Sequence, residues 1–183
     1  MRKNLGKKTY LFPMPVLIIG TFDEDGTPNA MNVAWGTICD FNQVELNLGE
    51  HQTTNNINRT KAFTVTFADV EHMVEADYVG LVSGAKVKDK VARASLQYEK
   101  SSFVNAPIFT DFSVTLECEL ETNDNGRIVG NIVNVVADEK VLDEKGNVDI
   151  EKMHLIAYDS SNNYYVEIGK KVGKAFSEGK KIK

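Results

Sequence analysis

The stretch Thr27-Pro-Asn-Ala-Met-Asn-Val-Ala-Trp-Gly36 is unusual for a β-strand, because Asn29 and Asn32 lie among small and apolar residues. The only tryptophan of the chain, Trp35, closes the stretch. An asparagine in a half-buried strand costs free energy unless its amide is hydrogen-bonded. Two interpretations stay open. Either the amides bond a ligand that lies close to the backbone around Ala34, or they bond turn backbone and Trp35 belongs to the core.

The residues before this stretch predict that it is the second half of a β-hairpin. Val16–Phe22 is an apolar run, and Asp23–Gly26 ends in the Asp-Gly pair that favours a tight turn. We therefore expect a hairpin over residues 16–37, entered through the rigid segment Pro13-Met-Pro15.

Most of the remaining chain also has strand patterns. Residues 43–48 alternate, with Val44, Leu46 and Leu48 expected inward, and further strands are expected at 62–67 and 164–168. A second hairpin is expected over 114–121 and 127–137, with Cys118 on the buried face, Glu117 and Glu119 in water, and a bulge at Gly130.

The predicted helices are short. Helices are expected at residues 53–59, with a Thr or Asn as N-cap, at 70–79, with Asp69 as N-cap, and at 148–156. Residues 89–94 are expected to form a short helical turn, and residues 101–111 a loop. Hairpins joined by short helices predict a mainly β protein with an antiparallel barrel, in a single domain over residues 1–183.

Charge is unevenly distributed along the 183 residues. The first ten carry four Lys or Arg and residues 170–183 carry six, which leaves eleven basic against 25 acidic residues between 11 and 169. Four of those eleven are Lys86, Lys88, Lys90 and Arg93, a candidate anion site or a solvated helix face. The cluster lacks interleaved aromatic residues, so a nucleic-acid surface is not expected.

Several classes of function are disfavoured by missing patterns. No dinucleotide-binding glycine motif and no phosphate-binding P-loop motif is present, and His51, His72 and His154 lack the spacing of metal ligands. No nucleophile signature is visible, and no apolar run is long enough for a membrane span or a signal core, so a cytoplasmic protein without a metal is expected. If the protein is an enzyme, a cofactor carries the reactive centre.

Two polar segments suit such a cofactor. Thr53, Thr54, Asn55 and Asn56 supply hydroxyl, amide and N–H groups at an expected helix N-terminus, which favours a phosphate. Ser83-Gly84 and Asp89-Lys90 add further donors and a cation. With Asn29–Trp35 these segments would surround a ligand that has a phosphate, a polar chain and a flat ring.

Taken together, the chain resembles the flavin reductase-like family. The matching residues lie in order from about residue 13 to 179: Pro15-Val16-x-Ile18-Ile19-Gly20-Thr21, Asp25-Gly26-x-Pro28-Asn29-Ala30-Met31-Asn32-Val33-Ala34-Trp35-Gly36, His51-x-Thr53-x-x-Asn56-Ile57, Phe63-Thr64-Val65, Ala76-Asp77-Tyr78-x-Gly80-x-x-Ser83-Gly84, Asp89-Lys90, Ala106-Pro107, Leu116-Glu117-Cys118, Val129-Gly130-x-Ile132 and Gly169-x-x-Val172-Gly173-x-Ala175-Phe176.

The resemblance implies a Greek-key split β-barrel that binds FMN near the interface of a homodimer. It implies that the flavin is lined by Asn32, Val33, Ala34 and Trp35, that Thr53, Thr54, Asn55 and Asn56 hold phosphate or ribityl oxygens, and that Ser83, Gly84 and Lys90 complete the site, with Lys90 as the phosphate's counter-charge. Trp35, Tyr164, Tyr165 or Phe176 would cover one face of the ring.

Two positions depart from the family pattern. Phe41-Asn42-Gln43 replaces prolines that many relatives carry, and Val33 stands where many have Ser or Thr.

Three functions remain open: a reductase that uses NAD(P)H and carries no protein catalytic residue, an electron carrier for a protein partner, and a barrel without turnover.

Overall fold

β-Strands dominate the computed structural model, which describes residues 1–182. The strands are β1 (Met14–Pro15), β2 (Leu17–Phe22), β3 (Pro28–Val33), β4 (Gly36–Asp40), β5 (Gln43–Asn47), β6 (Ala62–Phe67), β7 (Tyr98–Lys100), β8 (Pro107–Phe109), β9 (Val114–Asp124), β10 (Arg127–Ala137), β11 (Ile156–Asp159) and β12 (Tyr164–Glu167). The helices are α1 (Gln52–Thr60), α2 (Met73–Leu81), α3 (Lys90–Arg93) and α4 (Ile150–Met153), with 3₁₀ turns at Glu139–Val141 and Glu178–Lys181.

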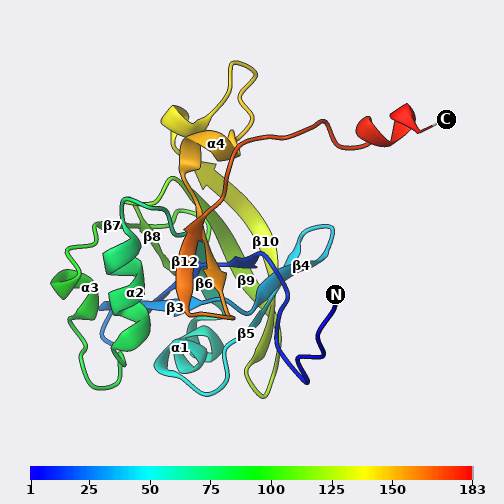
Figure 1. Ribbon diagram of the computed structural model, residues 1–183. Coiled ribbons are helices and arrows are strands. Elements are labelled where there is room, and N and C mark those ends of the chain that lie inside the picture. The colour runs from blue at the N-terminus through cyan, green and yellow to red at the C-terminus, as the bar shows by residue number, and fades with distance from the viewer. Residues whose placement is uncertain (183) are drawn as a thin grey trace.

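Seven strands form one antiparallel sheet in the order β3-β2-β6-β9-β10-β5-β4. Its two edge strands, β3 and β4, are consecutive in the chain and are joined only by Ala34 and Trp35. Three Cα steps span at most about 11 Å, so the sheet has to curl until its edges meet, as Figure 1 shows. The fold is therefore the expected split antiparallel barrel.

The seam between the edges is closed by backbone and by close packing. The Asn47 N–H donates to the Trp35 carbonyl at 2.9 Å. Gly36 lies between two apolar side chains, since a Cβ there would lie 2.6 Å from Leu17 Cδ1 and 2.9 Å from Leu46 Cδ2. A larger residue at position 36 would push these side chains apart at the seam.

Strand β2 is buried on both faces and separates two apolar clusters. Leu17 and Ile19 face the barrel interior, whereas Ile18 faces α2 and α3. The interior cluster comprises Leu17, Ile19, Val33, Val44, Leu46, Leu48, Ile57, Phe63, Val65, Cys118 and Ile128. Burial raises the pKa of the Cys118 thiol to about 12, so this cysteine stays protonated and unreactive, as expected for a core residue.

Several predicted elements are confirmed. Both hairpins turn where expected, with positive φ at Gly26 and Gly126, and Val44, Leu46 and Leu48 are buried. The register of β9 against β10 shifts between Val129 and Gly130, which confirms the bulge.

Other predictions about local structure were wrong. The segment 27–37 is two strands rather than one, because barrel closure breaks it at Ala34 and Trp35. The N-cap of α1 is His51, without a side-chain cap bond. Helix α2 begins at Met73 instead of residue 70, because the Asp69 carboxylate bonds the His72 N–H and ring and holds a turn there.

The expected loop at 101–111 contains strand β8, and the expected helix at 148–156 shortens to α4 and ends at β11. Glu117 is buried, whereas Glu119 is exposed as predicted. The Glu117 carboxylate accepts hydrogen bonds from the Ser101 hydroxyl and the Asn134 amide, which satisfy it without water. No helix within residues 1–182 is long and apolar enough to cross a membrane.

We predict that Gly20→Ala destabilises the barrel by about 3 kcal/mol. A Cβ at Gly20 would lie 2.3 Å from Thr64 Oγ1 and 2.9 Å from the Pro107 carbonyl oxygen. It would therefore break the hydrogen bond that Thr64 donates to that carbonyl. Urea unfolding followed by circular dichroism measures the loss. Gly169→Ala is the control, since a Cβ at Gly169 meets no atom within 4 Å, and equal stability of both variants would contradict the prediction.

Candidate functional site

Trp35 lies at the barrel seam in a pocket of about 540 Å³. The pocket is formed by the N-terminal segment Lys8–Leu11 and Pro13–Pro15, by Ala34–Thr37, and by Glu45 and Asn47 on β5. The Trp35 side chain is 52% exposed, so the interpretation that it belongs to the core was wrong. A flat, half-exposed aromatic face in a pocket can stack on a planar ring.

Asn32 and Val33, the two residues before this seam, turn their side chains into the protein. The Asn32 amide donates to the Ala76 carbonyl of α2 at 2.9 Å. Gly80 permits this approach, because a Cβ there would lie 2.8 Å from the Asn32 Cβ. Val33 is buried in the barrel interior, and only its backbone is suited to contact a ligand.

A buried polar network joins the first hairpin to α1. Asn29 Nδ2 donates to Thr53 Oγ1 at 2.9 Å and to Thr21 Oγ1 at 3.3 Å. Asn56 Nδ2 donates to Asp23 Oδ1 at 2.6 Å and to Thr21 Oγ1 at 3.1 Å. Thr53 and Asn56 therefore hold the helix on the barrel, and their side chains are engaged inside the protein.

The N-terminus of α1 opens into a second pocket, of about 670 Å³. Two predicted residues of the helix, Thr54 and Asn55, line it together with Ser83, and Thr54 Oγ1 also donates to the Gly49 carbonyl at 2.7 Å. Within residues 1–182, the N–H groups of Gln52, Thr53 and Thr54 have no hydrogen-bond acceptor. The first turn holds no acidic residue, so the positive end of the helix is not neutralised there.

Gly84 lies against Asn29, and the contact leaves one polar atom unpaired. A Cβ at Gly84 would lie 2.3 Å from Asn29 Oδ1, so only glycine fits. Asn29 is almost fully buried, and its Oδ1 has no hydrogen-bond partner within residues 1–182. Such an orphaned acceptor favours a ligand or water donor at this point. Gly84 also lines a smaller pocket with Lys88 that adjoins the second pocket at Gln52 and Ala85.

Lys90 differs from the expectation of a cation presented at the surface. Its side chain is 3% exposed, and its ammonium donates to the carbonyls of Val79 at 3.1 Å and Val82 at 3.0 Å, at the end of α2. Burial lowers the pKa of Lys90 to about 8, and Asp23 opposes this shift. Lys88, in the pocket that adjoins the N-terminus of α1, is an exposed cation.

The structure thus divides the predicted residues between two places. Ala34 and Trp35 lie at the seam pocket, and Thr54, Asn55, Ser83 and Gly84 lie around the N-terminus of α1. Pocket-lining residues that the sequence analysis missed as site residues are Lys8–Leu11, Pro13–Pro15, Asp23–Asp25, Gly36, Thr37, Glu45, Asn47, Glu50–Gln52, Asn58, Ala85, Lys88, Asn123, Asn125 and Gly126. They come from the N-terminal segment, from loops, from strands and from helix α1, which meet only when the barrel closes. Lys88 gave a sequence signal through its basic cluster, and Pro15, Asp25, Gly36 and His51 are among the residues that carry the family resemblance.

Within residues 1–182, no three His, Cys, Asp or Glu side chains gather where they could hold a metal ion. The chemistry that the two pockets offer is hydroxyl, amide and N–H donation at one and an aromatic face at the other.

We predict that Lys90 makes stability depend on alkaline pH. The pKa of Lys90 is lower in the folded state than its ordinary 10.5, so the unfolded state binds more protons between about pH 8 and 10.5. The free energy of unfolding should therefore rise with pH over this window, by about 2 kcal/mol relative to Lys90→Met after allowance for solvent screening. Urea unfolding at several pH values measures this difference. Lys88→Met, at an exposed position, is the control. A pH-independent difference between Lys90→Met and the wild type would contradict the prediction.

Comparison with known proteins gives the same fold. The model of the "Flavin reductase like domain" matches residues 9–161, and a search of curated proteins gives no match. The flavoredoxin of Desulfovibrio vulgaris (Miyazaki F) superposes with a TM-score of 0.94 at 31% identity, covering 98% of this chain and 100% of the other. The flavoredoxin from Methanosarcina acetivorans superposes with a TM-score of 0.89 at 25% identity, covering all of both chains.

A third structure, an FMN-binding domain of a flavin reductases-like enzyme from Shewanella baltica OS155, shares the fold at 18% identity. Its TM-score is 0.78, and the match covers 87% of this chain and 88% of the other. The extent of the family match, together with the 31% identity over nearly the whole chain, means that this protein belongs to the flavin reductase-like family.

Proposed function

We propose that this protein is an FMN-binding flavoprotein oxidoreductase that acts as an NAD(P)H-dependent flavin reductase. The observation that carries the proposal is the polar pocket at the open N-terminus of α1, in a fold whose seam presents Trp35. The name of the Shewanella baltica relative specifies FMN among the flavins.

The pocket at α1 suits the phosphate of FMN. Three N–H groups of the first turn lack an acceptor within residues 1–182, and Thr54, Asn55 and Ser83 add side-chain donors. A helix N-terminus of this kind favours an anion. Glu50 also lines the pocket. The exposed Lys88 lies in the adjoining pocket, 3.9 Å from Asp25 Oδ2, and would balance part of the negative charge.

The seam pocket suits the flavin ring. Its volume of about 540 Å³ lies within the usual range for cofactor pockets. It combines the Trp35 indole with the backbone of Ala34 and Trp35, where the sheet is interrupted, and with the start of β4 at Gly36 and Thr37. These residues would orient the ring and exclude water from one of its faces, whereas Asn32 and Val33 would act through their backbone.

Bound FMN would supply both hydride and single-electron transfer, so the protein needs no acid or base of its own. The contributions left to this chain are to anchor the phosphate, to position the ring and to limit access to it. Thr53 and Asn56 would contribute indirectly, because their bonds to Asn29 and Asp23 fix α1 on the barrel. Lys90 would contribute by holding the end of α2 near Ser83 and Gly84.

A flavoredoxin-like electron carrier, which passes electrons to a protein partner without oxidising NAD(P)H itself, is the second candidate. The 31% identity to the flavoredoxin of Desulfovibrio vulgaris (Miyazaki F) favours it. The excess of acidic residues between 11 and 169 is compatible with docking to a basic partner.

We predict that the purified protein shows a flavin absorption spectrum that NADH or NADPH bleaches promptly without oxygen. Prompt bleaching supports the reductase. A spectrum that persists until dithionite or a partner protein is added supports the electron carrier. A colourless protein that also fails to bind added FMN contradicts both.

We predict that Asn55→Asp weakens FMN binding about tenfold, since a new negative charge at the N-terminus of α1 repels a phosphate. Riboflavin, which lacks the phosphate, should keep its affinity. Quenching of flavin fluorescence measures both affinities, and Asn4→Asp in the exposed N-terminal segment is the control. An equal loss of FMN and riboflavin affinity would place the phosphate elsewhere.

A further inference from the structure

The N-terminal segment forms a wall that two pockets share. Residues 8–10 line the seam pocket that holds Trp35, and they also line a neighbouring pocket of about 370 Å³. We call this neighbouring pocket the basic pocket. It is lined by Lys7, Lys8, Thr9, Tyr10, Ser160 and Ser161. Both volumes lie within the usual range for small-molecule sites, so a ligand too long for one pocket can extend through both.

The basic pocket differs in charge from the pockets described above. Within residues 1–182, its lining holds two lysines and no acidic residue. Acidic residues line the seam pocket, the pocket at α1 and the pocket with Lys88: Glu45, Glu50 and Asp23–Asp25 respectively. Residues 1–22 contain no Asp or Glu. In a chain with a net charge of −5, this local excess of positive charge favours an anionic ligand.

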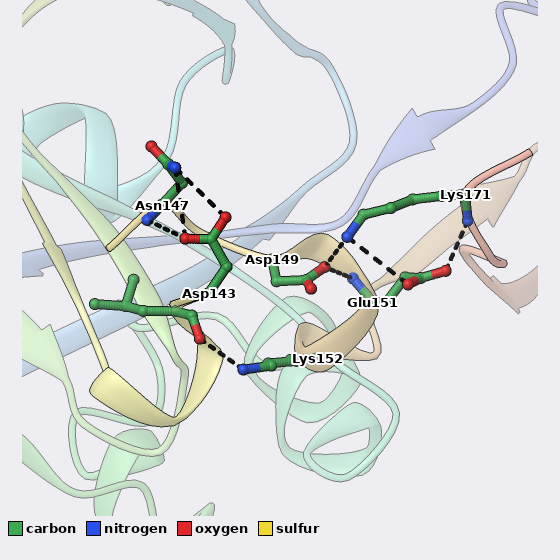
Figure 2. Close-up of polar contacts among 7 residues, drawn as sticks. Asp143, Asn147, Asp149, Glu151, Lys152 and Lys171 are labelled. Carbon is green, nitrogen blue, oxygen red and sulfur yellow. Dashed lines mark hydrogen bonds and ion pairs between the residues drawn. The ribbon is translucent and has the colours of Figure 1, made fainter. Parts of the chain in front are cut away.

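The two lysines of the basic pocket are not neutralised by the protein. Lys7 and Lys8 are exposed, and neither forms an ion pair within residues 1–182. Near the C-terminus the situation is different, since the Lys171 ammonium lies 2.5 Å from Asp149 Oδ1 and 3.7 Å from Glu151 Oε2, as Figure 2 shows. The charge of Lys171 is therefore used inside the protein, whereas the charges at the basic pocket are available to a ligand.

A second wall of the basic pocket is a turn that hydrogen bonds hold in place. Ser160 and Ser161 lie in the turn between β11 and β12, and the Ser160 hydroxyl donates to the Thr9 carbonyl at 3.2 Å. This bond joins the turn to the N-terminal segment. Hydrogen bonds from the Ser161 hydroxyl and the Asn162 amide lower the pKa of Asp159. The carboxylate nearest in sequence to the pocket is therefore bonded within the turn.

Tyr10 supplies an aromatic ring where the two pockets meet. It lines both pockets, it is 40% exposed, and it stacks on Phe12 with ring centroids 5.5 Å apart. An exposed aromatic ring of this kind stacks well on a nucleotide base. Along the shared wall, a ligand would therefore meet two cations, then an aromatic ring, then the pocket that holds Trp35.

This order matches the order of groups in NADPH. NADPH differs from NADH by a phosphate on the 2′ oxygen of its adenosine ribose, and proteins recognise this phosphate with a basic side chain. We propose that the basic pocket binds the adenosine 2′-phosphate of NADPH, with Lys7 and Lys8 as its counter-charges and Tyr10 against the adenine. The protein then prefers NADPH to NADH. This inference rests on the proposed reductase function and deepens it by choosing between the two nicotinamide cofactors.

Such a site does not need the dinucleotide-binding glycine motif, which the sequence lacks. In that motif, N–H groups at a helix N-terminus hold the diphosphate. In the basic pocket, lysine side chains hold a phosphate monoester, which carries about −1.5 to −2 charges at neutral pH. Lysine binds phosphate as a point charge, and the lysines are exposed, so the preference for NADPH should decrease as salt is added.

The first test compares NADP⁺ with NAD⁺, because the two differ only by the 2′-phosphate. In calorimetric titrations of the protein as purified, NADP⁺ should bind about tenfold more tightly than NAD⁺. The double variant Lys7→Gln/Lys8→Gln should lose this preference and keep its affinity for NAD⁺. Arg2→Gln/Lys3→Gln is the matched control, because it removes two charges from the same segment outside the basic pocket, and it should keep the preference.

Three results would overturn the proposal. The first is equal affinity for the two oxidised cofactors, or no binding of either. The second is a preference for NADP⁺ that survives Lys7→Gln/Lys8→Gln, which would place the 2′-phosphate elsewhere. The third is an equal loss of preference in Arg2→Gln/Lys3→Gln, which would mean that only the overall charge of the segment matters.

Tyr10→Leu separates the base from the phosphate. It should weaken NADP⁺ and NAD⁺ by the same factor, about tenfold, because both carry the adenine. The ratio of the two affinities should stay as in the wild type. Unchanged affinities for both would overturn the placing of the adenine against Tyr10.

Anaerobic bleaching of the bound flavin distinguishes failure of this inference from failure of the proposed function. At limiting concentration, NADPH should bleach the flavin about tenfold faster than NADH. Equal rates would overturn the inference and leave the reductase in place. A flavin that dithionite bleaches but neither nicotinamide cofactor does would overturn both.

Discussion

The two-residue connection between β3 and β4 is the constraint on which the rest of the structure depends. Because these strands are the opposite edges of a seven-stranded sheet, the connection by Ala34 and Trp35 forces the sheet to close. The same connection cannot itself be part of either strand. The Trp35 carbonyl helps to close the seam by accepting from the Asn47 N–H, whereas the Trp35 indole stays half exposed. Barrel closure therefore sets the place of Trp35 at the seam.

The polar network beneath α1 links closure to the second pocket. Thr21, Asp23 and Asn29 belong to the first hairpin, and they hold Thr53 and Asn56 of the helix. The first turn of α1 is thereby fixed with its N–H groups directed outward from the network. Of the two asparagines in the opening stretch, Asn29 bonds side chains and Asn32 bonds helix backbone, so neither bonds turn backbone. Within residues 1–182, the Asn29 Oδ1 atom of this network has no hydrogen-bond partner, and it lies beside Gly84.

Predictions from local pattern succeeded where one physical effect dominates. Alternation at Val44, Leu46 and Leu48 reports one buried face, and the Asp-Gly and Asn-Gly turns report backbone that glycine alone adopts easily. Predictions of which polar side chains are exposed failed where a segment distant in the sequence supplies the hydrogen-bond partner. Glu117 alternates like a solvent-facing residue, but the loop at Ser101, which no local pattern places there, covers it and bonds it. Lys90 reads as a surface cation, but the end of α2 folds over it.

By itself, the sequence determined the β-hairpins, the apolar faces, the turns and the polar segments proposed for the site, because these depend on residues close together in the chain. It also determined the family resemblance, because that depends on an ordered set of motifs. Only the tertiary structure decided which polar groups face outward. Thr53, Asn56 and Lys90 are chemically suited to a ligand, but each is turned to protein acceptors by strands and helices that meet it from elsewhere. The choice between satisfying a side chain internally and presenting it depends on what packs beside it, and that is fixed only when the barrel closes.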